Sequence, residues 1–385
     1  MLRRLIDILA CPACGESLRV TVIEWRERGK AEVGTPGCEG YCALLGMELN
    51  SPERRREAHE KCPLCYTQEI WEGTLTCPSR HTFQILRAIP RFLFPEGRAG
   101  RTKQTFDSEW MDFSYDTRIY GHSPREELQD LFERTGMDEE LLRGKRVLDA
   151  GCGMGRLCHT LSRTVMEIVG MDLSEGVEKA RALNEDSPHV HIVQGDIMNL
   201  PFRKESFDCA YSKGVLHYVP DVPRCLASLG SRVKQGGVLS VSLYPRMSLL
   251  FRVFARRVRR VSVRLPMRFN FRLSHALIPL LPLVWRCSGL PRRQIDWGER
   301  AHMIFNWLSS PYQNSATGRE LELWLTRVGF QAVRSGSIPL GITAVKTPSA
   351  HTPGPPVRDL SAIRGQLENR TAEYRIQNLE CREED

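Results

Sequence analysis

The sequence contains no run of about twenty uninterrupted apolar residues, the length that a helix needs to cross a bilayer. The nearest candidate, ALIPLLPLVW from Ala276 to Trp285, is too short and contains two prolines. The N-terminal stretch MLRRLIDILACPAC also lacks the long apolar core of a secretory signal. We therefore expect a cytoplasmic protein with no transmembrane segment.

The chain also lacks internal repeats and low-complexity arrays, and its hydrophobic content of 41% and charged content of 26% are those of a folded protein. Its 385 residues are too many for one small domain. Composition shifts predict a cysteine-rich domain over residues 1–95 and an α/β domain over residues 100–346. A basic insertion covers residues 246–300, and residues 347–385 are expected to form a flexible, charged tail.

Thirteen cysteines are many for this length, and in a reducing cytosol closely spaced cysteines are typical of metal sites. In one grouping, CPLC (62–65) and CPSRH (77–81) form one tetrahedral set, and CPAC (11–14) with CEGYC (38–42) forms a second. In the other grouping, CPAC and CPSRH form a single ribbon interrupted by residues 38–65. Both groupings predict zinc with a structural role, because complete ligand sets leave no coordination position open for a substrate. The number of zinc ions is one or two. The candidate ligands are Cys11, Cys14, Cys38, Cys42, Cys62, Cys65, Cys77 and His81.

The segment KRVLDAGCGMGR places three glycines directly after a short apolar run that ends in Asp149. The apolar run predicts a buried strand, and the glycines allow a tight turn and close approach of the backbone to a ligand. A helix expected from about Met154 would point its amino end at that ligand. The spacing GCGMGR departs from the GxGxxG of dinucleotide turns. It favours a smaller ligand held by an acid and backbone amides.

Three later segments also predict strands that end in polar residues. EIVGMDLS ends in Asp172, VHIVQGDIMNLPF in Asp196, and SFDCAYSKGVLHYV near Ser212. Because these segments alternate with helical patterns, they indicate a parallel α/β sheet whose strand ends share one ligand-binding edge. An acid at the end of the second strand is well placed to accept hydrogen bonds from ribose hydroxyls.

Four motifs in this order, VLDAGCGMGR, GMDLS, GDIMNLPF and FDCAYSKGVLHY, resemble those of class I S-adenosylmethionine-dependent methyltransferases of the type-11-like group. The resemblance covers about residues 106–346 and implies a Rossmann-like sheet; the alternative is another nucleotide-binding α/β domain. It implies that two of the glycines face the methionine part of the cofactor, that Asp172 binds the ribose, and that Asp196 with the Ile197 amide lies at the adenine. Cys152 reads as a small packing residue. The expected cofactor-binding set is Asp149, Gly151, Cys152, Gly153, Asp172, Leu173, Asp196, Ile197 and Ser212.

His217, in GVLHYV, is the candidate general base, since an imidazole with a pKa near neutrality could accept a proton. The resemblance favours a different role, because family members commonly carry a structural histidine here.

The cysteine-rich front resembles two families. LIDILACPACGESL and GTLTCPSRHTFQILRAIPRFL resemble the two ends of the zinc-ribbon protein that activates tRNA and protein methyltransferases. CPLC with LTCPSRHTF also resembles the zinc-binding front of the large-subunit rRNA guanine-N1 methyltransferases. ILRAIPRFLF stands where those enzymes have a lysine-containing run, and this favours the first resemblance.

No Asp or Glu occurs between Asp221 and Asp296, while arginines crowd residues 246–272. The pattern predicts a cationic amphipathic helix inserted after the fifth strand. It is consistent with a lid on the acceptor pocket, with a peripheral contact to anionic lipid through residues 247–272, or with an RNA-binding face. The apolar stripe expected on this helix is Leu250, Phe254, Val258, Val261 and Leu265.

These observations predict a methyltransferase that uses S-adenosylmethionine and acts on a small-molecule or lipid-linked acceptor. One alternative is an rRNA or tRNA base methyltransferase that recognises RNA through its zinc ribbon. The other is a cofactor-binding interaction module without catalysis, against which the intact glycine turn and Asp172 argue.

Overall fold

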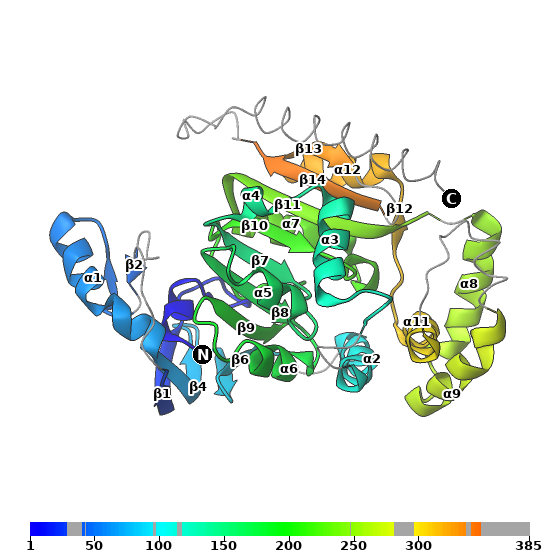
Figure 1. Ribbon diagram of the computed structural model, residues 1–385, viewed down its shortest axis with the longest axis horizontal. Helices are drawn as coiled ribbons and strands as arrows, with labels where there is room; N and C mark the ends of the chain where they lie inside the picture. Colours follow the sequence, from blue (N-terminus) through cyan, green and yellow to red (C-terminus); the bar gives the residue numbers. More distant parts are fainter. Residues whose placement is uncertain are drawn as a thin grey trace.

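The computed structural model describes residues 1–28, 41–42, 44–94, 98–113, 118–246, 248–280, 296–335 and 340–347. Figure 1 shows one large sheet with helices packed around it and a separate group of helices at one side. Cys38, the tail beyond residue 347 and part of the segment 276–285 lie outside the described residues.

The centre of the sheet has the strand order β9-β8-β7-β10-β11-β14-β13. The first five strands are parallel, and β14 lies antiparallel between β11 and β13. This order confirms a Rossmann-like class I methyltransferase fold. The strands are β7 (Arg146–Ala150), β8 (Glu167–Asp172), β9 (Val190–Gly195), β10 (Phe207–Ser212), β11 (Val233–Pro245), β13 (Phe330–Ser335) and β14 (Leu340–Lys346), with the short β12 (Ser315–Ala316) beside the end of β11.

Nearly every residue of β7 to β10 is buried, as expected for parallel strands covered on both faces. Adjacent residues belong to different cores, because side chains alternate along a strand. Val147 lies in the core that contains Leu131 and Leu157, and Leu148 lies in the core that contains Leu226 and Leu321. The helices around the sheet are α3 (Pro124–Thr135), α4 (Glu139–Leu142), α5 (Arg156–Leu161), α6 (Gly176–Leu183), α7 (Val222–Arg232) and α12 (Gly318–Arg327), with the 3-10 turn η2 (Leu216–Tyr218).

The front of the chain continues the same sheet. Its strands extend the order as β1-β4-β5-β6, and β6 pairs in parallel with β9. Figure 1 shows this extension and helix α1 at the left of the molecule. The elements are η1 (Arg3–Asp7), β1 (Arg19–Glu27), β2 (Tyr41–Cys42), β3 (Met47–Glu48), α1 (Pro52–Thr67), β4 (Gln68–Thr76), β5 (Thr82–Leu86) and β6 (Ile89–Phe92).

A buried ion-pair network joins the front to the central sheet. Glu167, at the start of β8, accepts hydrogen bonds from Arg4 of η1 at 3.1 Å and Arg146 of β7 at 2.7 Å. The His191 ring lies 2.9 Å from the same carboxylate. Burial alone would raise the pKa of Glu167, but Arg4, His191 and Arg146 hold it well below its usual range. Removing one partner would leave buried charge uncompensated, so this network fixes η1 against the sheet.

The basic insertion follows the fifth parallel strand, as the sequence predicts, and folds into helices. α8 (Leu249–Ser262), α9 (Met267–Leu277) and the turn η3 (Ile278–Leu280) pack with α11 (Trp297–Ser309) around a small core of their own. Figure 1 shows this group at the right, with α2 (Arg98–Asp112) between it and the sheet. Arg101 of α2 donates to the carbonyls of Ser309 and Leu265, and this fastens the group to α2.

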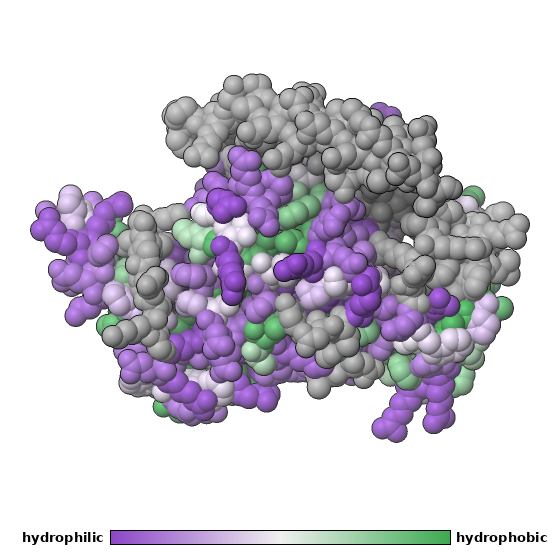
Figure 2. All heavy atoms as spheres, in the orientation of Figure 1, coloured by the Kyte–Doolittle hydropathy of each residue, from purple (hydrophilic) through white to green (hydrophobic). Residues whose placement is uncertain are grey.

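The apolar stripe expected on α8 is only partly packed. Val258 contacts the small helical core, whereas Phe254 is 60% exposed and Val261 is 61% exposed. Figure 2 shows polar and apolar residues intermixed at this end of the molecule. Among the described residues, no helix combines the length and apolar character needed to span a membrane.

Candidate functional site

The glycine turn after β7 has the backbone conformation and the close contacts that exclude side chains. Gly151 has a φ of 105°, and a Cβ there would lie 2.1 Å from the Val215 side chain. Gly153 has a φ of 54°, and a Cβ there would lie 2.7 Å from the indole of Trp110. Both positions therefore require glycine. Trp110 lies on α2, so this helix covers the turn directly.

Asp172 ends β8 and is tied to the same turn. One carboxylate oxygen accepts from the Gly153 amide at 2.8 Å, and the other accepts from the Ser174 amide at 2.8 Å and hydroxyl at 2.6 Å. Burial raises the pKa of Asp172, while these hydrogen bonds lower it. The carboxylate is thus held in place beside the turn, with acceptor capacity left for further hydroxyl groups.

The other expected cofactor residues also lie at the carboxyl ends of the strands. Burial raises the pKa of Asp149 to about 7, and Asp196 accepts from the Met198 amide at 2.9 Å. The Ser212 hydroxyl donates to the carbonyl of Ala150 at 2.8 Å and so links the ends of β10 and β7. Leu173 and Ile197 follow β8 and β9, and Cys152 lies within the turn.

This arrangement fits an adenosyl cofactor. At two positions of the turn only backbone fits, so a ligand can approach it closely. Carboxylates lie at the ends of three neighbouring strands, where they can accept hydrogen bonds from the hydroxyl and amino groups of such a cofactor. Cys152 packs against Gly170 and the Cys158 thiol, and its pKa is raised well above the usual range, chiefly by that thiol and by burial. Cys152 is thus a neutral packing residue here.

His217 is buried in η2 and stacks on Tyr244, with ring centroids 3.8 Å apart. Burial lowers the pKa of His217 to about 3. Its Nδ1 has no hydrogen-bond partner among the described residues. An imidazole that is neutral and so weakly basic is a poor general base at neutral pH.

A buried carboxylate that no sequence motif marked lies next to the glycine turn. Glu109 of α2 is 1% exposed and accepts hydrogen bonds from the Tyr120 hydroxyl and, at 2.8 Å, from the Asn306 amide of α11. Burial raises the pKa of Glu109 to about 7; the two hydrogen bonds oppose this rise, and the charge of Asp172 adds to it. Glu109 belongs to the charged segment DSEWMD, and acidic residues on helices are usually exposed. Only the tertiary structure could therefore show that this carboxylate is buried.

Aromatic side chains lie near this carboxylate. The ring of Phe106, one helical turn before Glu109, lies 5.0 Å from that of Tyr218. The pKa of Tyr218 is raised well above its usual range by burial and by the nearby Tyr244 and Glu109, so its hydroxyl stays protonated. Tyr244 remains 36% exposed. Glu109, its hydrogen-bond partners Tyr120 and Asn306, and these aromatic groups are called the carboxylate cluster below.

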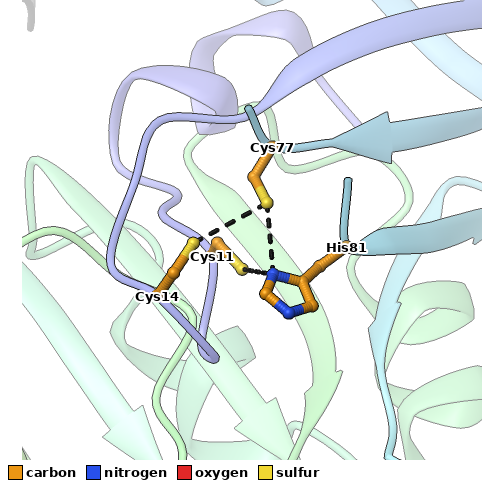
Figure 3. A group of neighbouring side chains, drawn as sticks. All are labelled: Cys11, Cys14, Cys77 and His81. Atoms are coloured by element: carbon orange, nitrogen blue, oxygen red, sulfur yellow. Dashed lines mark hydrogen bonds between the residues drawn. The ribbon is translucent and has the colours of Figure 1, made fainter. Parts of the chain in front are cut away.

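The cysteines of the front form one close group. The ligand atoms of Cys11, Cys14, Cys77 and His81 all lie within 4.8 Å of one another, and Figure 3 shows them converging from the loop after η1 and from the hairpin between β4 and β5. The Sγ atoms of Cys14 and Cys77 are 3.7 Å apart, and His81 Nδ1 lies 3.6 Å from Cys11 and 3.3 Å from Cys77.

These distances fit a tetrahedral ion. Zinc bonds of about 2.3 Å to sulfur and about 2.0 Å to nitrogen place two sulfurs about 3.8 Å apart, and a sulfur and a nitrogen about 3.5 Å apart. The structure therefore brings together the ligands of the grouping with a single ribbon, in which CPAC and CPSRH share one ion. It separates the members of the other grouping, since Cys62 and Cys65 lie on α1. Cys42, Cys62 and Cys65 are buried outside this group, which is the only set of metal-ligating side chains this close in the described part of the chain.

Comparison with known proteins agrees with the fold. Residues 148–241 match a family described as a methyltransferase domain. The matched residues include the glycine turn and strands β8 to β10, so this part of the chain is similar to methyltransferase domains.

Individual relatives are similar over parts of the chain. The phthiotriol/phenolphthiotriol dimycocerosates methyltransferase 1 of Mycobacterium ulcerans is 34% identical over 30% of this chain and 43% of its own length. The ubiquinone biosynthesis O-methyltransferase of Rhodopseudomonas palustris is 27% identical over 48% of this chain and 71% of its own. The phosphoethanolamine N-methyltransferase 1 of Haemonchus contortus is a structural neighbour with a TM-score of 0.44, 15% identity, and coverage of 73% of this chain and 56% of its own. The chain thus spans less than half the length of the mycobacterial relative.

Proposed function

We propose that the protein transfers the methyl group of S-adenosylmethionine to a hydroxyl oxygen of a small-molecule or lipid-linked acceptor. The observation that carries this proposal is the carboxylate cluster, a largely buried polar site beside the glycine turn and covered by α2 and α11. Enclosed sites with a few convergent polar groups are typical of small-molecule binding. The names of the relatives, an O-methyltransferase among them, favour the same acceptor class.

The residues of the chain act mainly by positioning. The bound cofactor supplies an electrophilic methyl group. We assign its methionine part to the turn at Gly151 and Gly153, its ribose to Asp172, and its adenine to Asp196 and the Ile197 amide. Trp110 packs against Gly153 of the turn, and we assign it the role of excluding water from the methionine part of the cofactor. We assign His217 a structural role, because its low pKa suits packing against Tyr244.

Labelled cofactor tests this proposal directly. The purified protein is incubated with S-adenosylmethionine carrying a labelled methyl group and a cell extract, and the products are divided into RNA, protein and organic-soluble fractions. We expect the label in the organic-soluble fraction. Label confined to RNA would support the base methyltransferase instead, and no label in any fraction would support a binding module without catalysis.

For the front of the chain we propose a zinc-ribbon-like domain over residues 1–95. One structural zinc ion would be held by Cys11, Cys14, Cys77 and His81. The support is the close match between their separations and tetrahedral geometry. Metal binding in such small modules is coupled to folding, so the ion would fix the β4–β5 hairpin against the loop after η1.

A second proposal concerns α8 as a peripheral contact with anionic lipid. Arg256, Arg257 and Arg260 are exposed on this helix together with Phe254 and Val261. Exposed arginines with apolar side chains beside them are typical of helices that lie in a bilayer interface. Such a contact would bring the helical group next to a lipid-linked acceptor.

A further inference from the structure

Glu109 is a buried carboxylate, and the described part of the chain places no compensating cation on it. Among the described residues, only the neutral donors Tyr120 and Asn306 bind it. Burying a carboxylate without a charged partner is costly. A neutral side chain such as Gln could make the same hydrogen bonds without this cost, so an acid at this position points to chemistry that needs ionisation.

We propose that Tyr120 and Glu109 form a proton relay that deprotonates the hydroxyl of the acceptor. This inference rests on the proposed function and names the groups that would serve it. We assign Tyr120 to the acceptor side of the relay, because Tyr120 is partly exposed whereas Glu109 is buried.

The backbone at Tyr120 supports this role. Its φ of 51° lies in the left-handed region, which is unfavourable for a residue with a bulky side chain. Strained conformations of this kind persist where the surrounding structure enforces them, and they concentrate at functional sites. Here the neighbouring Gly121 amide donates to Glu299 of α11 at 3.1 Å, which holds the loop so that the Tyr120 hydroxyl points at Glu109.

The step balances in atoms and charge. As the new bond between the acceptor oxygen and the methyl carbon forms, the acceptor O–H bond breaks and its proton passes to the Tyr120 oxygen. Tyr120 gives its own proton to Glu109. The electron pair of the broken methyl–sulfur bond stays on sulfur, which leaves as S-adenosylhomocysteine. Glu109 then returns its proton to water when the products leave.

The surroundings of Glu109 suit this acid-base role near neutral pH. With burial raising its pKa to about 7, the carboxylate is ionised above that pH and strong enough as a base to accept a proton. The titratable groups that face it are Tyr120, Asp172, Tyr218 and Tyr244. Burial and the charge of Glu109 raise the pKa of Tyr120 well above its usual range, so Tyr120 passes a proton on without ionising.

Two variants test the relay by the pH profile of label transfer to the organic-soluble fraction. In the wild type we expect the rate to rise through about pH 7. Glu109→Gln should lower the rate at least a hundredfold, in line with general-base catalysis, and should abolish that rise, with cofactor affinity unchanged. Asn306→Leu removes a hydrogen bond that lowers the pKa of Glu109, so the rise should move to higher pH. Glu322→Gln, which neutralises an exposed carboxylate on α12 far from the relay in the sequence, is the control and should keep the wild-type profile.

A readout without turnover uses infrared difference spectra of the protein titrated across neutral pH. We expect a carboxylic acid band that disappears as the pH rises, and that Glu109→Gln lacks. An unchanged rate and pH profile in Glu109→Gln, with label still transferred, would overturn the relay alone. A labelled product that alkali hydrolyses would overturn the relay together with the hydroxyl acceptor of the proposed function, because a methyl ester forms from a carboxylate and needs no base. Absence of label from the organic-soluble fraction of the wild type would overturn the proposed function together with the relay.

Discussion

Replacing Glu109 by Gln should make the protein more stable at neutral and alkaline pH. The ordinary pKa of a glutamate is 4.5, and burial raises that of Glu109 to about 7 in the folded chain. Between these values the folded state binds more protons than the unfolded state, so the free energy of unfolding falls as the pH rises. At about 1.4 kcal/mol for each pKa unit, the loss amounts to about 3 kcal/mol. It is absent below pH 4.5 and complete above about pH 7.

Urea unfolding followed by tryptophan fluorescence at several pH values measures this contribution. The stability of Glu109→Gln relative to the wild type should increase by about 3 kcal/mol between pH 4.5 and pH 8. The hydrogen bonds of the new amide add an offset, but that offset does not vary with pH because the amide does not titrate. A difference that stays flat across this range would refute the reasoning, since it would mean that Glu109 titrates in the folded protein as it does in water.

Three further predictions follow from the sites described above. Asp172→Ala should weaken S-adenosylmethionine binding by about 2 kcal/mol, or about thirtyfold, through lost hydrogen bonds to the ribose; calorimetry checks this, with the exposed Asp186→Ala as control. Metal analysis should find zinc that Cys77→Ser loses and that Cys225→Ser, a buried core variant, retains; zinc-free wild type would end the proposal. Sedimentation with phosphatidylglycerol vesicles should show binding that Phe254→Asp abolishes and that Leu323→Asp, exposed on α12, does not; wild type that stays in the supernatant would exclude lipid contact.

Much of the central fold could be predicted from the sequence because its signals are local. An apolar run that ends in an acid, followed by glycines, specifies strand, turn and helix within residues 145–156. The strand ends at Asp172 and Ser212 were predictable for the same reason. The helix Gly318–Arg327 starts at Thr317 with Glu320 in a capping box, a signal that lies within four residues.

The rest depends on contacts between distant residues. No spacing rule decides whether the CPAC motif pairs with residues 38–42 or with CPSRH, because a metal site requires only that the ligands meet in space. The carboxylate cluster is a stronger example. Glu109, Tyr120 and Asn306 come from three separate segments, and each residue taken alone is ordinary for its surroundings in the sequence.

The parallel pairing of β6 with β9 has a consequence for aggregation. In the central sheet alone, β9 would be an outer strand, and all of its residues, VHIVQG, are buried in the intact chain. A bare apolar strand of this kind offers unpaired backbone groups to other chains. The front of the protein covers it and makes β1 the outermost strand instead, with Arg19, Glu24, Arg26 and Glu27 along an exposed edge. Charged side chains at that edge discourage pairing between copies, although Ile23 and Trp25 on the same strand are also exposed. The front of the chain thus replaces a bare apolar edge of the sheet with a largely charged one.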